Sequence, residues 1–158
     1  MDLSIRKANK DDYKSLLSLF RQVHDLHVYE RPDLYKENST PVSQEFFESQ
    51  LNDVKQHIFV ATIGNELVGV VVMKEEEITE NSFVKVRNVL FINSLCIADA
   101  QRKKGIGKRL MKYVFDFGRS LKVDCIELGV SEKNPYAIEF YESIGMTTKG
   151  RKMEIILN

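Results

Sequence analysis

The stretch QRKKGIGKRL, from Gln101 to Leu110, gathers five cationic side chains around two glycines. A strand-like run ends just before it, near Ile97, and apolar residues recur at helical spacing after Gly105. A turn of this kind presents unpaired backbone N–H groups, with the positive end of the helix dipole behind them. Glycines would let the backbone approach phosphate oxygens closely. The stretch therefore predicts a phosphate-binding turn, and a solvated helix start with surface lysines is the alternative.

The totals describe an ordinary globular chain. Its 158 residues suit one domain spanning 1–158, and 23 Lys and Arg balance 23 Asp and Glu. No net field therefore draws the chain to nucleic acid or a membrane. The start, MDLSIRKANKDD, lacks the apolar core of a signal peptide, and the longest apolar run, Leu67 to Met73, is too short to span a bilayer. With only two cysteines, both in apolar runs, we expect a reduced, cytoplasmic protein.

The apolar spacing predicts alternating elements along the chain. Helices are expected from Asp11 to Leu26, from Ser43 to Leu51, after Gly105 to Leu121, and over 134–145. Strands are expected near Leu3 and over 57–63, 66–73, 86–97, 125–130 and 151–157. Gly64-Asn65 predicts a two-residue hairpin, and Glu75 to Glu77 are expected at the tip of the next one. This order predicts an α/β fold with a mixed sheet flanked by helices.

Three segments together carry a family resemblance. They are SLCI (94–97), RKKGIG (102–107) and NPYAIEFYESIGM (134–146). In this order the chain resembles the GNAT superfamily of acyl-CoA N-acyltransferases, whose central sheet is mostly antiparallel. The last segment is similar to the signature Asn-x-x-Ala-x-x-Phe-Tyr-x-x-x-Gly-Phe, with Met146 where phenylalanine is usual. Many members carry glycine where this chain has Lys103.

The resemblance implies acetyl-CoA as donor and a direct transfer of its acetyl group to a primary amine. The pantetheine arm would lie beside Leu95, Cys96 and Ile97, and Asn134 would contact it, although Asn before Pro is also a good helix N-cap. The pyrophosphate would lie on the turn, whose implied binding residues are Arg102, Lys103, Lys104, Gly105, Ile106, Gly107 and Lys108. Two rival classes stay open: a CoA-binding sensor with little turnover, and a nucleotide-binding protein.

Tyr141 is similar to the family's general acid, which protonates the departing thiolate. It follows Asn134 by two helical turns, roughly 10 Å along one side of the helix, so both can reach one extended ligand. A phenol, with a pKa of about 10, keeps its proton at neutral pH. A core tyrosine is the alternative reading.

The general base is not evident from the sequence. Many relatives carry carboxylates where this chain has Asn93 and Ser94, so the proton would leave through water or a more distant group. Candidates for that group are His24, His27, Glu30 and Glu75 to Glu77. The histidines lack partners at metal-ligand spacing, so no metal is expected, and no nearby histidine would activate Cys96 as a nucleophile.

Two segments have more than one reading. Residues 29–41 could form an acceptor-side lid or a plain connector. The last predicted strand, at 151–157, could be an exposed edge that supports a homodimer.

Overall fold

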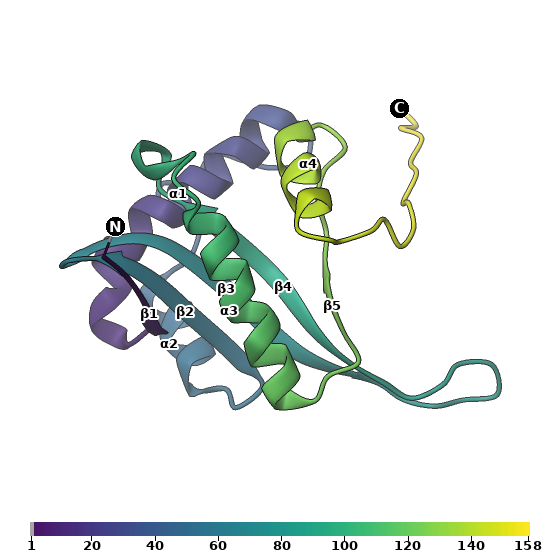
Figure 1. Cartoon of the computed structure of the whole chain (residues 1–158). Coiled ribbons are helices and arrows are strands. Elements are labelled where there is room, and N and C mark those ends of the chain that lie inside the picture. Colours follow the sequence, from purple (N-terminus) through teal and green to yellow (C-terminus); the bar gives the residue numbers. More distant parts are fainter. Residues whose placement is uncertain (1) are drawn as a thin grey trace.

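The computed structural model describes residues 2–158 and contains one five-stranded sheet in the order β1-β2-β3-β4-β5. Its strands are β1 (Leu3–Lys7), β2 (Gln56–Ile63), β3 (Glu66–Ile78), β4 (Arg87–Ile97) and β5 (Cys125–Leu128). Neighbouring strands run antiparallel except β4 and β5, which are parallel. The predicted mixed, mostly antiparallel sheet is confirmed (Figure 1).

Helices cover both faces of the sheet (Figure 1). They are α1 (Tyr13–Glu30), α2 (Gln44–Asn52), α3 (Ile106–Leu121) and α4 (Pro135–Ser143), with short 3-10 turns η1 (Lys10–Asp12) and η2 (Asp99–Gln101). One face carries α1 and α2, packed on alternate side chains of β2, β3 and β4. The other carries α3, which buries Leu110, Met111 and Val114, and α4 at its margin. The sheet core is therefore closed from both sides, as an α/β layered fold requires.

Local signals explain where several elements begin. The Ser43 hydroxyl accepts a hydrogen bond from the Phe46 N–H and caps α2, and Gly64, at φ +61°, turns the β2–β3 hairpin. The next hairpin differs from the prediction. Glu75 to Glu77 lie inside β3, paired with β4, and the turn falls at 79–86 instead. Charged residues are tolerated in this part of β3 because the β3–β4 hairpin extends beyond the helices, where its faces are in contact with solvent (Figure 1).

The β4 strand contains a bulge at Asn93. Val72 of β3 pairs with Ser94 and Met73 with Ile92, so Asn93 is the extra residue. A bulge inverts the alternation of side chains between the two faces. Ile92 before it and Leu95 after it consequently point to the same face, toward α3.

The predicted strand at 151–157 is wrong for the single chain. Residues 147–158 contain no helix or strand and are exposed, although the pattern of apolar residues is strand-like. A strand needs a neighbour for its backbone N–H and C=O groups, and residues 2–158 supply none at this place.

Candidate functional site

The cleft at the end of β4 arises because β5 pairs with only part of it. The parallel pairing runs from Val89 to Ile92, and beyond it the β4 edge at 93–97 has no strand beside it among the described residues. The Ala98 N–H donates to the Val68 carbonyl at 2.8 Å, so the peptide groups of Ala98 face β3. Because alternate residues of a strand point their peptide groups to opposite edges, those of Leu95 and Ile97 face the opening. The peptide groups of Cys96 face β3.

Gln22 of α1 holds this strand end in place. Its Nε2 donates to the Ile97 carbonyl at 2.8 Å, and its Oε1 accepts from the Asp99 N–H at 3.1 Å. One carboxamide thus bridges the last residue of β4 and the first residue of η2. No sequence signal distinguishes Gln22 from the other polar residues of an amphipathic helix, so its role could not be predicted.

Cys96 is part of the core and is not a nucleophile. It is buried between the sheet and α1, and burial raises the pKa of its thiol to about 12. At neutral pH it therefore carries no thiolate.

The turn between β4 and α3 has the backbone form of an anion site. Lys103 and Gly105 both adopt left-handed conformations, at φ +64° and +79°. Lys103, which stands where relatives have glycine, therefore adopts a conformation that glycine favours. The Arg109 N–H donates to the Gly105 carbonyl, and the amides ahead of Arg109 in the first turn have no acceptor within the helix. These amides and the helix dipole together favour an anion.

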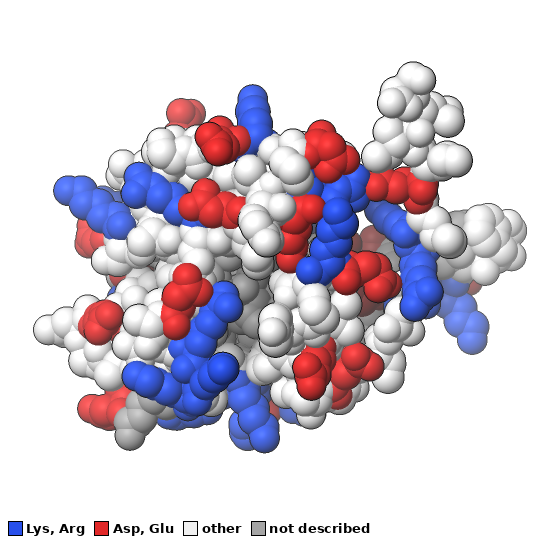
Figure 2. Space-filling model, turned by 90° about the horizontal axis from the view of Figure 1, so that it is seen from above, with Lys and Arg blue, Asp and Glu red and all other residues white. Residues whose placement is uncertain are grey.

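The cationic side chains of the turn lie on the surface. Arg102 pairs with Asp99 at 3.1 Å, and the Lys104 ammonium donates to Gln101 at 3.0 Å. Lys103 and Lys108 are exposed. Seen from above, Lys and Arg side chains gather beside a hollow in the protein surface (Figure 2). Such exposed charges add to anion attraction at modest strength, because water and salt screen them.

Gly107 is the point where three elements meet. A Cβ built on it would lie 3.2 Å from the Phe140 ring of α4 and 3.8 Å from the Ile97 side chain. The absence of a side chain at Gly107 therefore lets α4 pack against the start of α3. This packing accounts for a glycine that the sequence analysis attributed to phosphate approach. The Ile106 side chain is likewise buried in the core, so only its amide can face a ligand.

Helix α4 carries both of its predicted site residues. The Asn134 Oδ1 accepts from the Ala137 N–H at 3.1 Å, so Asn134 is the N-cap, and its NH₂ group is a further donor. Tyr141 lies two turns later, its ring 5.3 Å from that of Phe140. Burial raises the pKa of its phenol to about 12. The hydroxyl is therefore fully protonated near neutral pH.

The candidate bases lie in different places. Glu75 pairs with His57 at 2.7 Å, and the His57 ring packs on Phe117, which is eleven residues from the start of α3. That offset corresponds to roughly 16 Å of helix, so this pair is remote from the turn. Asn93, at the bulge, is exposed and carries no basic group.

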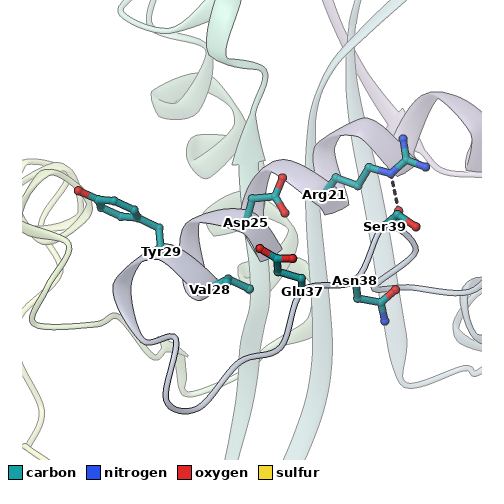
Figure 3. Close-up of a pocket in the computed structure, with 7 residues that line it drawn as sticks. All are labelled: Arg21, Asp25, Val28, Tyr29, Glu37, Asn38 and Ser39. Atoms are coloured by element: carbon teal, nitrogen blue, oxygen red, sulfur yellow. Dashed lines mark hydrogen bonds between the residues drawn. The ribbon is translucent and has the colours of Figure 1, made fainter.

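The α1 histidines lie under the segment that follows the helix. A His24 ring nitrogen lies 2.7 Å from the Lys36 carbonyl, and the His27 ring stacks on Tyr35 at 5.0 Å. Burial lowers the pKa of His27, which is therefore neutral at pH 7. Hydrogen bonds from Arg21 to Ser39 and from Tyr13 to Val42 also tie this segment to α1. A hollow of about 730 Å³ lies between them, lined by Arg21, Asp25, Val28, Tyr29, Glu37, Asn38 and Ser39 (Figure 3).

Comparison with known proteins identifies the family. The model of the acetyltransferase (GNAT) family matches residues 21–146, which include the β4 edge, the turn and all of α4. The chain belongs to the acetyltransferase (GNAT) family.

Relatives and solved structures agree with this assignment. The GNAT chain is 25% identical over 146 residues to an uncharacterised N-acetyltransferase of Methanocaldococcus jannaschii, covering 92% of this chain and 61% of that relative. A tetramutant of the BH1408 protein of Bacillus halodurans superposes with a TM-score of 0.94 at 29% identity, covering 98% and 99% of the two chains. The aminoglycoside N-acetyltransferase AAC(6')-Iy, solved with CoA, shares the fold, with a TM-score of 0.75 at 16% identity over 98% and 94%.

Neither a membrane-spanning helix nor a metal-holding cluster is present in the described part of the chain. Within residues 2–158, no helix has the length and apolar character needed to cross a bilayer. The same residues contain no group of three or more His, Cys, Asp or Glu side chains placed to hold a metal ion.

Proposed function

We propose that the protein is an N-acetyltransferase that transfers an acetyl group from acetyl-CoA directly to a primary amine. The observation that carries the proposal is the meeting of three parts at Gly107. These are the open edge of β4, the first turn of α3 and the helix that bears Tyr141. A donor with a long arm and a pyrophosphate needs an open strand edge and an anion site next to each other.

The backbone supplies most of the proposed donor site. The pantetheine arm would pair with the peptide groups of Leu95 and with the N–H of Ile97, since the Ile97 carbonyl is bonded to Gln22 and the peptide groups of Cys96 are directed to β3. The pyrophosphate would accept hydrogen bonds from the amides of residues 103–108, next to the Arg102 guanidinium. The NH₂ group of Asn134 would donate to the arm while its oxygen caps α4.

Tyr141 is the proposed general acid. Acetyl-CoA supplies an activated acyl group: the amine nitrogen forms a bond to the carbonyl carbon, the carbon–sulfur bond breaks, and the thiolate takes a proton. With a pKa raised to about 12, Tyr141 holds that proton until the thiolate forms. Burial raises the pKa of a thiol as well, which narrows the difference in pKa between the phenol and the thiol in a desolvated cleft. The N–H groups near the Asn93 bulge are candidates to stabilise the oxyanion.

The proton of the attacking amine leaves through water in this proposal. The carboxylates of Glu75 to Glu77 lie in the far part of β3, and Asn93 and Ser94 are not bases. The lack of a basic side chain at Asn93 and Ser94 also motivates a second candidate function, a CoA-binding domain with little turnover. A broad amine panel separates the two, because the sensor would show slow thioester hydrolysis and no acetylated acceptor.

The setting of the activity is also proposed. The two free cysteines, Cys96 and Cys125, fit a reducing, cytoplasmic location. The chain length and the single sheet fit one domain over residues 1–158.

Thermal melting with acetyl-CoA, CoA, ATP and NAD⁺, each in large excess, tests the donor site. A ligand at about 100 times its dissociation constant adds roughly 2.7 kcal/mol to the free energy of unfolding. We expect a rise in melting temperature with the two CoA compounds only. An equal rise with ATP, or none with CoA, would refute the proposed donor.

A further inference from the structure

Tyr136, in the first turn of α4, presents its aromatic ring to solvent. The residue is 84% exposed, so almost none of it packs against the rest of the fold. The start of the helix does not depend on it either, because Asn134 caps α4 and Pro135 is its first residue. Tyrosine is moreover not among the residues that favour a helix start. The ring is therefore free to contact a ligand.

The α4 helix places Tyr136 at the edge of the sheet where the proposed donor site lies. Strands β4 and β5 are parallel, so their carboxyl ends meet at the same edge. The turn at 98–105 follows β4, and the loop at 129–134 follows β5 and leads directly into α4. In Figure 1 the turn and the first part of α4 both lie on the upper side of the molecule. Tyr136 and the turn thus border the same opening.

The Phe140 ring shows which side of α4 Tyr136 occupies. A Cβ built on Gly107 would lie 3.2 Å from the Phe140 ring, so this side of α4 faces the first turn of α3. Residues four apart lie on the same side of a helix, about 6 Å apart along its axis. Side chains also lean toward the start of their helix. Tyr136 therefore lies one turn beyond the α3 contact, on the solvent side of the proposed pyrophosphate site.

The adenosine end of acetyl-CoA has no residue assigned to it in the proposed donor site. It joins directly to the pyrophosphate, so it must bind beside the turn, at the outer end of the cleft. Adenine is a flat aromatic base, and such bases stack readily on exposed aromatic side chains. The 3′-phosphate on the same sugar is an anion, and Lys103 and Lys104 of the turn are exposed cations. An aromatic ring and cations, the two kinds of group that an adenosine phosphate requires, thus border this opening.

We propose that the adenine of the donor stacks on the Tyr136 ring, and that this contact makes the protein select CoA thioesters over acyl groups carried on phosphopantetheine without adenosine. The inference rests on the proposed use of acetyl-CoA as donor. The thioester, the arm and its first phosphate are common to both classes of donor, so only residues that contact the remainder can distinguish them. Tyr136 is a specificity residue in this proposal and takes no part in the acetyl transfer itself.

Isothermal titration calorimetry with three thioesters tests the contact. Tyr136→Ala should raise the dissociation constants for acetyl-CoA and for acetyl-3′-dephospho-CoA about tenfold or more, because both contain adenine. The dissociation constant for S-acetyl-4′-phosphopantetheine, which lacks adenine, should stay unchanged. Tyr136→Phe keeps the ring and should bind all three as the native protein does. Because Tyr136 is exposed, neither variant should change the melting temperature.

Phe83→Ala is the matched control for the removal of an exposed aromatic ring. Phe83 is 85% exposed in the β3–β4 turn. The eleven residues of β4 separate that turn from the proposed donor site, a distance of roughly 35 Å along the strand. Phe83→Ala should therefore leave all three dissociation constants unchanged.

A fluorescent variant reports the stacking directly, because the native chain contains no tryptophan. Tyr136→Trp places a single indole at the proposed platform, and stacking on adenine should quench its emission. Saturating acetyl-CoA should therefore quench Tyr136→Trp, whereas S-acetyl-4′-phosphopantetheine should not. Phe83→Trp should respond to neither compound.

The outcomes separate this inference from the proposed function. If the native protein binds none of the three thioesters, the proposed donor is wrong, and the adenine contact is refuted with it. If the native protein binds acetyl-CoA but Tyr136→Ala binds it equally well, or weakens all three thioesters alike, the adenine contact is refuted while the donor stands. Unchanged emission of Tyr136→Trp at saturating acetyl-CoA would also overturn the contact.

Discussion

Replacement of Gln22 by alanine tests whether a residue outside the cleft positions the donor site. The Gln22 carboxamide makes two hydrogen bonds with main-chain groups, to the Ile97 carbonyl at 2.8 Å and from the Asp99 N–H at 3.1 Å, and its Nε2 also donates to the Cys96 sulfur at 3.3 Å. These join α1 to the end of β4 and to the start of the turn. Gln22→Ala removes both bonds and leaves the rest of the helix intact.

The magnitude follows from the number of bonds. Each contributes about 1 kcal/mol to the free energy of unfolding, and alanine regains a few tenths through helix propensity. We therefore expect Gln22→Ala to lower the free energy of unfolding by about 1.5 to 2 kcal/mol. The freed turn must then be ordered when the donor binds, so the dissociation constant for acetyl-CoA should rise about tenfold, or 1.4 kcal/mol. The maximal rate should change little, because Gln22 lies outside the proposed reacting groups.

Urea unfolding and acetyl-CoA titration measure the two effects separately. Ser18→Ala, one turn earlier on the exposed face of α1, is the control and should change neither. Gln22→Glu should keep the bond from the Asp99 N–H but place a carboxylate oxygen against the Ile97 carbonyl, so it should also weaken acetyl-CoA binding. If stability falls while the dissociation constant stays unchanged, Gln22 supports the fold alone and the positioning argument fails.

Three further predictions follow from named side chains. Tyr141→Phe should lower the acetyl-transfer rate about 100-fold or more while acetyl-CoA binding is retained. An unchanged rate of acetyl transfer would remove Tyr141 from the mechanism. Hydrogen bonds from Arg6 lower the pKa of Asp12, so this pair stabilises the fold above the unfolded-state pKa near 3.9 and the effect is lost as pH falls through the lower folded value. Because the pair is partly exposed, Arg6→Gln should lower the free energy of unfolding by about 1 to 2 kcal/mol at pH 7. The free energy of unfolding, measured in urea, should then fall less steeply toward acid pH than in the native protein, and an unchanged slope would contradict this. In native protein at pH 8, a thiol reagent should modify Cys125 and leave Cys96 unreacted until urea is added, and equal rates for the two would mean that Cys96 is not buried.

Much of the fold could be predicted because its signals are local. The Ser43 and Asn134 caps and the Gly64 turn act within three residues of themselves, and each was found where the spacing placed it. The order of elements and the glycine-rich turn indicated the family before any contact was known. The acidic hairpin tip was misplaced because charge is compatible with a strand that extends into water.

The candidate site was predicted in its parts but not in its assembly. The sequence motifs indicated the turn and α4, and Gly107 was expected to contact a phosphate. The packing of Gly107 against Phe140, which lies 33 residues later, depends on how α4 folds against the start of α3. The Asn93 bulge depends likewise on the register with β3.

The sequence by itself determined most of the elements, the Ser43 and Asn134 caps, the position of the glycine-rich turn and the family. Only the tertiary structure decided that Gln22 holds the end of β4, that the peptide groups of Leu95 and Ile97 face the opening, and that residues 151–158 have no strand partner within residues 2–158. The physical reason is range. Caps, turns and periodicity depend on neighbours within a few residues, whereas these contacts depend on which distant atoms the folded chain brings within hydrogen-bonding distance.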